Sequence, residues 1–444
     1  MVANARTPSS RDALHDAAFR PMEAPGRWFW PVALGLAGIV AVAFGAYVYQ
    51  VIEGLWVAGY NDKAFYGIYE ANLVAFIGVS YGGALVSAVL RLTNARWRAP
   101  ITRMAEAVAL VSLVVGGAFA IIHLGRPERI WRLIVDPQAS SPIVWDLIAI
   151  STYLLATAIF LYLPLIPDLA TTRDRLPARA PRLVRAFYRL VALGWTGTPE
   201  QRRLLNRSVG AIAILIIPLA VSVHSVLAWA FSMTSRAGWH SSIFGPYFVV
   251  GALYSGVALV VIVVAAFRRA YRLERYISLD HFVSLARIMA VLAAVYLYFT
   301  FSEMLTAGYV RTREEAPIVA VMLEGAYAPA FWGFVVLGIF VPIMLSVLSA
   351  TRSVRYLVLA AALAVVGMWL KRMLITLPTA TAPLIGDVWG TVQLTWVAIV
   401  ITVGATAAIP LGLMLIFRFM PILAVDEMTE LLPGSAPAVG GEAR

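Results

Sequence analysis

The sequence has no cysteine among its 444 residues. Without thiols the chain can form no disulfide, cannot ligate an iron–sulfur cluster through thiolates and cannot attach a c-type haem. Charge is scarce too, because 13% of the residues are charged while 61% are hydrophobic. This balance excludes an ordinary soluble domain and indicates a polytopic membrane protein. Basic residues outnumber acidic ones by 35 to 24, but most lie in loops between apolar segments, which favours a role in membrane topology over nucleic-acid binding.

Ten apolar segments are long enough to cross a bilayer as helices. Their runs are nearly continuous and lack the alternation of a membrane strand, so we expect an all-α membrane protein rather than a barrel. The first run is longer than the apolar core of a cleavable signal peptide. The predicted membrane domain, 28–418, lies between an N-terminal tail, 1–27, and a partly disordered C-terminal tail, 419–444. The predicted spans are 28–49, 69–91, 104–125, 144–166, 208–233, 244–267, 282–306, 330–350, 355–376 and 392–418.

Lysine and arginine are distributed unevenly between the two sets of loops. The tails and loops of one side carry 25 of them, whereas the other side carries seven, namely Lys63, Arg126, Arg129, Arg132, Arg236, Arg311 and Arg313. The side richer in basic residues normally stays in the cytoplasm, so we predict that both termini are cytoplasmic, in a bacterial inner membrane. The loops that follow the odd-numbered spans then face outward.

The beginnings of spans 2 and 6 resemble each other. Span 2 opens with Phe65-Tyr66-Gly67-Ile68-Tyr69 and span 6 with Ile243-Phe244-Gly245-Pro246-Tyr247. Both spans begin on the same predicted face, as a parallel internal repeat requires. The repeat predicts two four-helix bundles, spans 2–5 and 6–9, with spans 1 and 10 at the periphery.

Two ionisable residues meet at one predicted membrane face. His123 closes span 3, and Asp146 opens span 4 after a short polar turn. Ionisable groups are costly at this depth and are usually functional there. Oxidation of a quinol releases two protons with its two electrons, and a histidine and a carboxylate are suitable acceptors for these protons. We interpret the pair as catalytic, against the alternative of interfacial groups that reach water or form a structural ion pair.

Further charged residues are predicted at similar depth on other spans. Lys371 and Arg372 lie near the outer end of span 9, and Glu303 near that of span 7. Arg372 could orient a quinone oxygen, and Glu303 could complete the site. A structural role explains Arg372 or Glu303, taken singly, equally well.

A further histidine, His224, lies near the middle of span 5. With Ser222, Tyr81, Tyr153 and Tyr254 it could form a proton relay, or it could make an ordinary interhelical hydrogen bond. A secondary transporter with a site around His224 is a rival interpretation, and a purely structural anchor is another. His123 and His224 lie at different depths, which argues against a haem between them, and no spacing of residues predicts a metal site.

Longer stretches resemble the NrfD/PsrC family of quinone-interacting membrane subunits and, within it, the ActC-type subunits of alternative complex III. The resemblance covers spans 2 to 10. It is carried by Arg103-Met104-Ala105-Glu106-Ala107, Ile122-His123-Leu124-Gly125-Arg126-Pro127, Ser141-Pro142-Ile143-Val144-Trp145-Asp146, Ser222-Val223-His224-Ser225, Gly238-Trp239-His240-Ser241-Ser242-Ile243-Phe244-Gly245-Pro246-Tyr247-Phe248 and Gly367-Met368-Trp369-Leu370-Lys371-Arg372. ActC-like chains usually carry an aspartate where this chain has Ala230, and a Gly-His-Ala-Gly pattern where it has Ser80-Tyr81-Gly82-Gly83.

The resemblance implies a ten-helix subunit without haem or iron–sulfur cluster and with a quinone pocket near the outer face. Its residues, carried over by position, are His123, Asp146 and Arg372, flanked in the matched motifs by Arg126 and Trp145. Electrons would pass to an iron–sulfur subunit outside the membrane, beside further membrane and multihaem cytochrome subunits or a molybdopterin subunit.

We therefore expect the chain to be a subunit of a quinol-dependent oxidoreductase, without chemistry of its own when isolated. It would oxidise a quinol, menaquinol in our interpretation, and could contribute to proton translocation. The alternative is a quinone-reducing anchor of a molybdenum or iron–sulfur oxidoreductase of the polysulfide reductase type. The sequence does not distinguish the direction of electron flow, the quinone or the complex.

Overall fold

A computed structural model describes residues 10–62, 64, 66–177, 180–234, 236–348, 352–383 and 388–431. These residues form helices joined by loops, and their only β-type pairing is an isolated bridge between Asn61 and Ala64. The predicted all-α class is confirmed. Lys63, which entered the loop count, and residues 432–444 of the predicted C-terminal tail lie outside this part of the chain.

Ten spans in the described chain are long and apolar enough to cross a membrane, in agreement with the sequence prediction. The fifth begins nine residues before its predicted start, because Thr198 caps the backbone N–H of Gln201 and Pro199 occupies the first helical position. The spans are α2 (Phe29–Glu53), α3 (Ile68–Leu92), α4 (Ala99–Ile122), α6 (Pro142–Tyr162), α9 (Pro199–Ser232), α10 (Phe244–Tyr271), α11 (Leu279–Val310), the continuous run of α13 (Ala328–Gly333), the π-helical segment η5 (Phe334–Phe340) and α14 (Val341–Val347), α15 (Val354–Thr381), and α16 (Trp396–Phe419).

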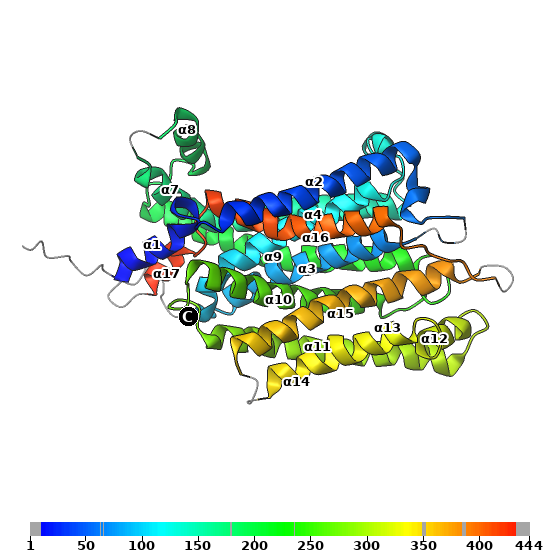
Figure 1. Cartoon of the computed structure of the whole chain (residues 1–444). Coiled ribbons are helices and arrows are strands. Elements are labelled where there is room, and N and C mark those ends of the chain that lie inside the picture. The colour runs from blue at the N-terminus through cyan, green and yellow to red at the C-terminus, as the bar shows by residue number, and fades with distance from the viewer. Residues whose placement is uncertain are drawn as a thin grey trace, which may run out of the picture.

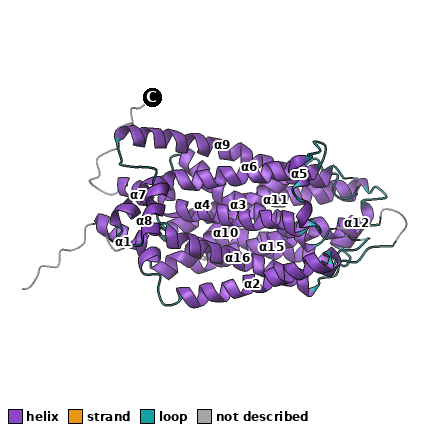
Figure 2. Cartoon of the chain, turned by 90° about the horizontal axis from the view of Figure 1, so that it is seen from above, coloured by secondary structure: helices purple, strands orange, loops and turns teal. Residues whose placement is uncertain are grey.

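Shorter helices cover the two ends of the bundle (Figures 1 and 2). The terminal end, as we call it, carries α1 (Ser10–Glu23), α7 (Ile166–Arg175), α8 (Arg182–Val191) and α17 (Val425–Glu430). The opposite end carries α5 (Arg132–Val135) and α12 (Ala316–Leu323). The remaining short turns are η1 (Leu55–Ala58), η2 (Arg96–Arg98), η3 (Pro127–Arg129) and η4 (Leu163–Leu165).

The spans pack as two four-helix bundles, as the internal repeat predicted. Helices α3, α4, α6 and α9 form the first bundle, and α10, α11, α13–α14 and α15 form the second. Helices α3 and α10 join the bundles along their length, and α2 pairs with α16 at the periphery beside α4. Helix α3 is consequently buried over most of its length.

Glycines permit the closest contact between the two bundles. A Cβ atom on Gly82 of α3 would overlap the backbone of Gly256 in α10, and it would lie 2.6 Å from the amide nitrogen of Val257. Small residues at such a position let two membrane helices approach each other through their backbones. The α3–α10 interface therefore depends on the absence of a side chain at these two positions.

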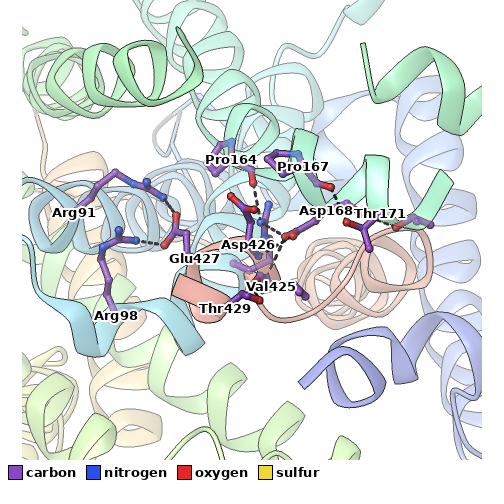
Figure 3. Close-up of polar contacts among 12 residues, drawn as sticks. Arg91, Arg98, Pro164, Pro167, Asp168, Thr171, Val425, Asp426, Glu427 and Thr429 are labelled. Carbon is purple, nitrogen blue, oxygen red and sulfur yellow. Dashed lines mark hydrogen bonds and ion pairs between the residues drawn. The ribbon is translucent and has the colours of Figure 1, made fainter. Parts of the chain in front are cut away.

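A buried polar cluster ties α17 to the terminal end (Figure 3). Arg103 donates to Asp168 at 2.8 Å, and the same carboxylate accepts the N–H groups of Val425 and Asp426 at 3.3 and 3.1 Å. Asp168 thus pairs with a buried arginine and caps the first turn of α17. Helix α17, Val425–Glu430, lies within the predicted C-terminal tail, 419–444.

Two arginines hold the next residue of α17. Glu427 forms ion pairs with Arg91 and, at 2.7 Å, with Arg98. Burial alone would raise the pKa of the Glu427 carboxyl, but the charges of both arginines outweigh it and hold the pKa below its usual value. The carboxylate therefore stays ionised and keeps α17 in place.

Substitution of one interface glycine tests the packing of the two bundles. Gly82→Ala should lower the stability of the purified protein by about 1–3 kcal/mol, because its methyl group would force α3 away from α10. Gly210 in α9 has no atom within 4 Å of the Cβ position and provides the matched control. Thermal unfolding in detergent should show Gly210→Ala unchanged or slightly stabilised. Equal midpoints for the two variants would contradict the proposed packing.

Candidate functional site

A cavity of about 810 Å³ lies at the opposite end of the first bundle, between α3, α4, α6 and α9. We call it the first-bundle cavity. His123 and Asp146 both line it, so the structure brings the two predicted catalytic residues to one space. Most of the wall is apolar. The remaining polar lining residues are Tyr60, Tyr66, Glu70, Ser141, Ser151 and Thr234.

The local fold fixes the orientation of His123. The residue follows the last turn of α4, and its Nδ1 lies 2.7 Å from the carbonyl oxygen of Phe119. A carbonyl can only accept, so Nδ1 must carry the proton of the neutral ring. The Nε2 atom then keeps a lone pair and can act as a base.

A buried glutamine anchors the end of α4. Gln50 of α2 donates to the carbonyl oxygen of Ile122 at 3.0 Å and accepts the hydroxyl of Tyr69 at 2.6 Å. Ile122 precedes His123, and the Tyr69 ring also packs against Phe119. Three helices thus cooperate to hold the imidazole at the edge of the cavity.

Asp146 lies in the second turn of α6, which begins with Pro142 at the first helical position. Its Oδ1 atom is buried and accepts no hydrogen bond, and no cation forms an ion pair with it, among the residues that the structure describes. A buried carboxyl oxygen without a protein partner is unusual, although the Asp146 residue as a whole is only half-buried. It is therefore suited to exchange a proton with a ligand in the cavity.

Glu70 is a second carboxyl of the cavity, and the sequence analysis missed it. It occupies the third position of α3, where its Oε2 atom accepts the N–H of Gly67 and the hydroxyl of Tyr60, both at 2.7 Å. The pattern Gly67-x-x-Glu70 at the start of an apolar run is a helix-start signal that could have revealed it. Glu70 fixes the entry into α3.

Tyr66 lies close to both carboxyls of the cavity. Burial raises the pKa of its phenol, and the nearby carboxyls of Glu70 and Asp146 raise it further. Burial and Glu70 likewise raise the pKa of Tyr60 well above its usual value. Both phenols therefore remain protonated near neutral pH and act as hydrogen-bond donors.

The structure does not bring the other predicted quinone-binding residues into this cavity. Arg126 is exposed in the loop after α4. Trp145 precedes Asp146 on α6, and its indole N–H donates to the carbonyl oxygen of Ala139 at 2.6 Å. Adjacent residues of a helix point about 100° apart, so Trp145 is directed elsewhere when Asp146 faces the cavity.

Arg372 and Glu303 lie in the second bundle. Glu303 accepts from Lys371 at 3.1 Å beside a separate cavity of about 310 Å³. Arg372 donates to the hydroxyl of Tyr296 at 3.3 Å and borders a third, apolar cavity of about 660 Å³. Their helices belong to the other bundle, and Arg372 also lies deeper than predicted, because its Nη2 faces Gly78, about two turns further along α3 than Glu70.

The predicted relay residues are divided as well. His224 is fully buried, and its ring lies 4.8 Å from that of Tyr81. Tyr153 is buried close enough to Tyr81 for an electrostatic interaction. Ser222 is exposed and bonds the carbonyl of Pro218, while Tyr254 donates to the carbonyl of Gly338 in the second bundle. The structure therefore groups His224, Tyr81 and Tyr153 and leaves out the other two.

No group of three or more His, Asp or Glu side chains in the described chain could hold a metal ion. Fold and site together define a multi-pass membrane protein with a largely apolar cavity that is lined at one end by His123, Glu70 and Asp146.

Comparison with known proteins identifies the family of this chain. The model of the family "Polysulphide reductase, NrfD" matches residues 56–383, and the chain belongs to this family of membrane subunits of oxidoreductase complexes. It is 28% identical to a proposed membrane subunit of dimethyl sulfoxide reductase from Halobacterium salinarum, over 87% of this chain and 90% of that one. It is 25% identical to a subunit of selenate reductase from Mesobacillus selenatarsenatis, over 75% and 78%. It is 23% identical to the Hdr-like menaquinol oxidoreductase integral membrane subunit of Archaeoglobus fulgidus, over 82% and 83%.

Removal of the Glu70 carboxyl tests its positioning role. Glu70→Ala leaves the hydroxyl of Tyr60 and the N–H of Gly67 without their acceptor, at an expected cost of about 2–4 kcal/mol in stability. Glu70→Gln keeps an acceptor oxygen and should recover at least half of this loss. Thermal unfolding of the three proteins measures the difference. If Glu70→Ala melts like the unsubstituted protein, Glu70 does not anchor α3.

Proposed function

We propose that the chain is the quinol-binding membrane subunit of its oxidoreductase complex and that quinol is oxidised in the first-bundle cavity. The observation that carries the proposal is the shared position of the His123 base and the unpaired Asp146 carboxyl. Two ionisable side chains that can each accept a proton are rarely found together in a membrane-embedded cavity. The apolar wall suits the hydrocarbon tail of a quinol.

The chemistry requires two proton acceptors and one electron acceptor. Oxidation of a quinol breaks two O–H bonds and yields a quinone, two protons and two electrons. The Nε2 atom of His123 takes one proton, and the carboxylate of Asp146 takes the other. The phenol of Tyr66 is a donor that can help to orient a ring oxygen, whereas the hydroxyl of Tyr60 donates to Glu70.

The electrons must leave to a partner, because the chain has no cysteine and the described residues form no metal site. We infer that an iron–sulfur protein docks over α5 at the opposite end, beside the cavity. The basic residues favour this arrangement, since they are concentrated at the terminal end, which is then cytoplasmic. The protons would leave outward.

The relatives support quinol as the electron donor. Two are named as subunits of reductases, which need a source of electrons, and the third is named as a menaquinol oxidoreductase subunit. We infer menaquinol for this chain from the third name. A molybdenum or iron–sulfur reductase is then a closer analogy for the complex than alternative complex III, whose ActC-type subunits carry an aspartate where Ala230 lines the cavity here.

We further propose that His224, Tyr81 and Tyr153 continue a polar route inward from the cavity. Leu227 lines the cavity, and His224 lies one turn deeper on the same helix. The hydroxyls of Tyr81 and Ser112 are buried without a hydrogen-bond partner in the described part of the chain. Such groups commonly bind ordered water, which could carry a proton along this route.

Substitution of the two acceptors tests the proposal. His123→Gln and Asp146→Asn should each lower quinol-dependent turnover of the assembled complex about 100-fold or more, because each removes one proton acceptor. His240→Gln and Asp136→Asn are matched controls at the same end of the molecule but outside the cavity. Turnover near the unsubstituted rate in both cavity variants, with normal assembly, would refute the proposal.

Arg372 distinguishes the cavity of the structure from the site that the resemblance implied. Its charge acts on His224, but its side chain does not line the first-bundle cavity. Arg372→Gln should therefore lower kcat while the KM for quinol changes less than about twofold. Steady-state kinetics with a soluble quinol analogue measures both constants. An increase in KM with kcat unchanged would instead indicate that Arg372 binds the quinol directly.

A further inference from the structure

Helix α8 has two contrasting faces. Arg182, Arg185 and Arg189 recur at spacings of three and four residues, as do Leu183, Phe187 and Leu190. Leu183 and Leu190 are 85% and 73% exposed, and the three arginines are exposed as well. A helix with a basic face and an unburied apolar face is typical of a segment that lies in a membrane interface.

Two hydrogen bonds fix the depth of α8. The hydroxyl of Tyr188 donates to the carbonyl oxygen of Phe419 at 2.9 Å, and the hydroxyl of Tyr162 donates to that of Val191 at 2.7 Å. Phe419 and Tyr162 are the last residues of α16 and α6. Helix α8 is therefore attached where two membrane spans end, and Figure 1 shows that it projects from the side of the bundle at the terminal end.

A cleft of about 680 Å³ lies between α8, α7, α1 and the end of α16. Arg175 and Arg418 both line this α8 cleft, and Glu23 is the only acidic residue among its lining residues. Apolar side chains, including Leu183 and Phe187, line much of the remainder. The cleft thus combines positive charge with a hydrocarbon-like wall at the depth of the interface.

The arginines of the α8 cleft and of α8 itself form no ion pair within the described chain. Arg418 donates to the carbonyl oxygen of Pro21 at 3.2 Å, and the guanidinium of Arg175 lies 5.1 Å from the ring centre of Phe19. Neither forms an ion pair with a described residue, nor do the three arginines of α8. By contrast, Arg91, Arg98 and Arg103 at the same end are all paired with carboxylates.

We propose that the α8 cleft binds an anionic phospholipid from the leaflet at the terminal end. Arg175 and Arg418 hold the phosphate, Leu183 and Phe187 contact the acyl chains, and the arginines of α8 attract further anionic headgroups. A soluble anion or an acidic protein would satisfy the arginines but would leave the apolar face of α8 in water. An anionic lipid satisfies both faces. The site is about one membrane thickness away from the first-bundle cavity and does not depend on quinol chemistry.

Lipid titration of the purified full-length chain tests this site. The protein is delipidated in detergent and titrated with phosphatidylglycerol or with phosphatidylcholine of the same acyl chains, while native mass spectrometry counts bound lipid and thermal unfolding reports stabilisation. Phosphatidylglycerol should bind with at least about tenfold higher affinity, given two cations at the site. Equal binding of the two lipids would overturn the proposal. Equal protection by inorganic phosphate alone would overturn it too, because the cleft would then be a simple anion site.

Variants assign the binding to the cleft. Arg175→Gln with Arg418→Gln should reduce phosphatidylglycerol affinity about tenfold or more, whereas Arg175→Lys with Arg418→Lys, which keeps the charge, should recover most of it. Arg352→Gln with Arg355→Gln removes the same charge from exposed residues at the terminal end of the second bundle and should leave affinity unchanged. Equal losses in the cleft and control variants would show that only overall charge matters. A cleft variant that is folded, by helical signal and gel filtration, yet binds normally would also overturn the proposal.

Discussion

The close approach of α3 to α10 is the constraint on which the rest of the structure depends. Lipid offers no hydrophobic drive that would bring two membrane helices together, so association relies on close packing and on polar contacts. Gly82 and Gly256 allow the two backbones to touch, and Gly83 does the same for α3 against the backbone of Ala105 in α4. Helix α3 is thereby enclosed between the bundles, and its first turn delivers Glu70 to the cavity in a fixed position.

The same interface explains how a buried arginine is accommodated between the bundles. A Cβ atom on Gly251 of α10 would lie 3.0 Å from Nη2 of Arg372, and one on Gly78 of α3 would lie 3.7 Å from it. These glycines leave room for the guanidinium of Arg372, which reaches from α15 to the α3–α10 interface. Its charge there is close enough to act on His224. The repeat therefore gives the two bundles a similar arrangement of helices but different polar side chains. The first bundle has the unpaired carboxyl of Asp146, and the second has Arg372 and the Lys371–Glu303 ion pair.

The sequence predicted well those features that depend on length, apolarity and depth. Ten spans follow from these properties, and so does the shared cavity of His123 and Asp146, because the two residues flank one short turn between adjacent spans. The two bundles follow from the internal repeat. Lateral position within the membrane was harder to predict. Arg372 and Glu303 were predicted from depth alone, although the predicted bundles had already assigned their spans to the second bundle. The helix-start role of Glu70 was readable from the local Gly67-x-x-Glu70 pattern, but its contact with Tyr60 depends on the path of a loop, which hydropathy does not encode.

The pairing of carboxyls separates structural from chemical roles in this chain. Asp168, Glu427 and Glu303 each accept from an arginine or lysine, and removal of such a partner from a buried pair is strongly destabilising. Glu70 and Glu106 lack an ion pair but accept hydrogen bonds, from Tyr60 and Gly67 in one case and from Ser87 in the other. Asp146 alone among these six has neither in the described chain, although it borders a large cavity. A protein that needed this carboxyl only for stability would supply it with a partner, whereas one that uses it to exchange protons must leave it accessible to the substrate.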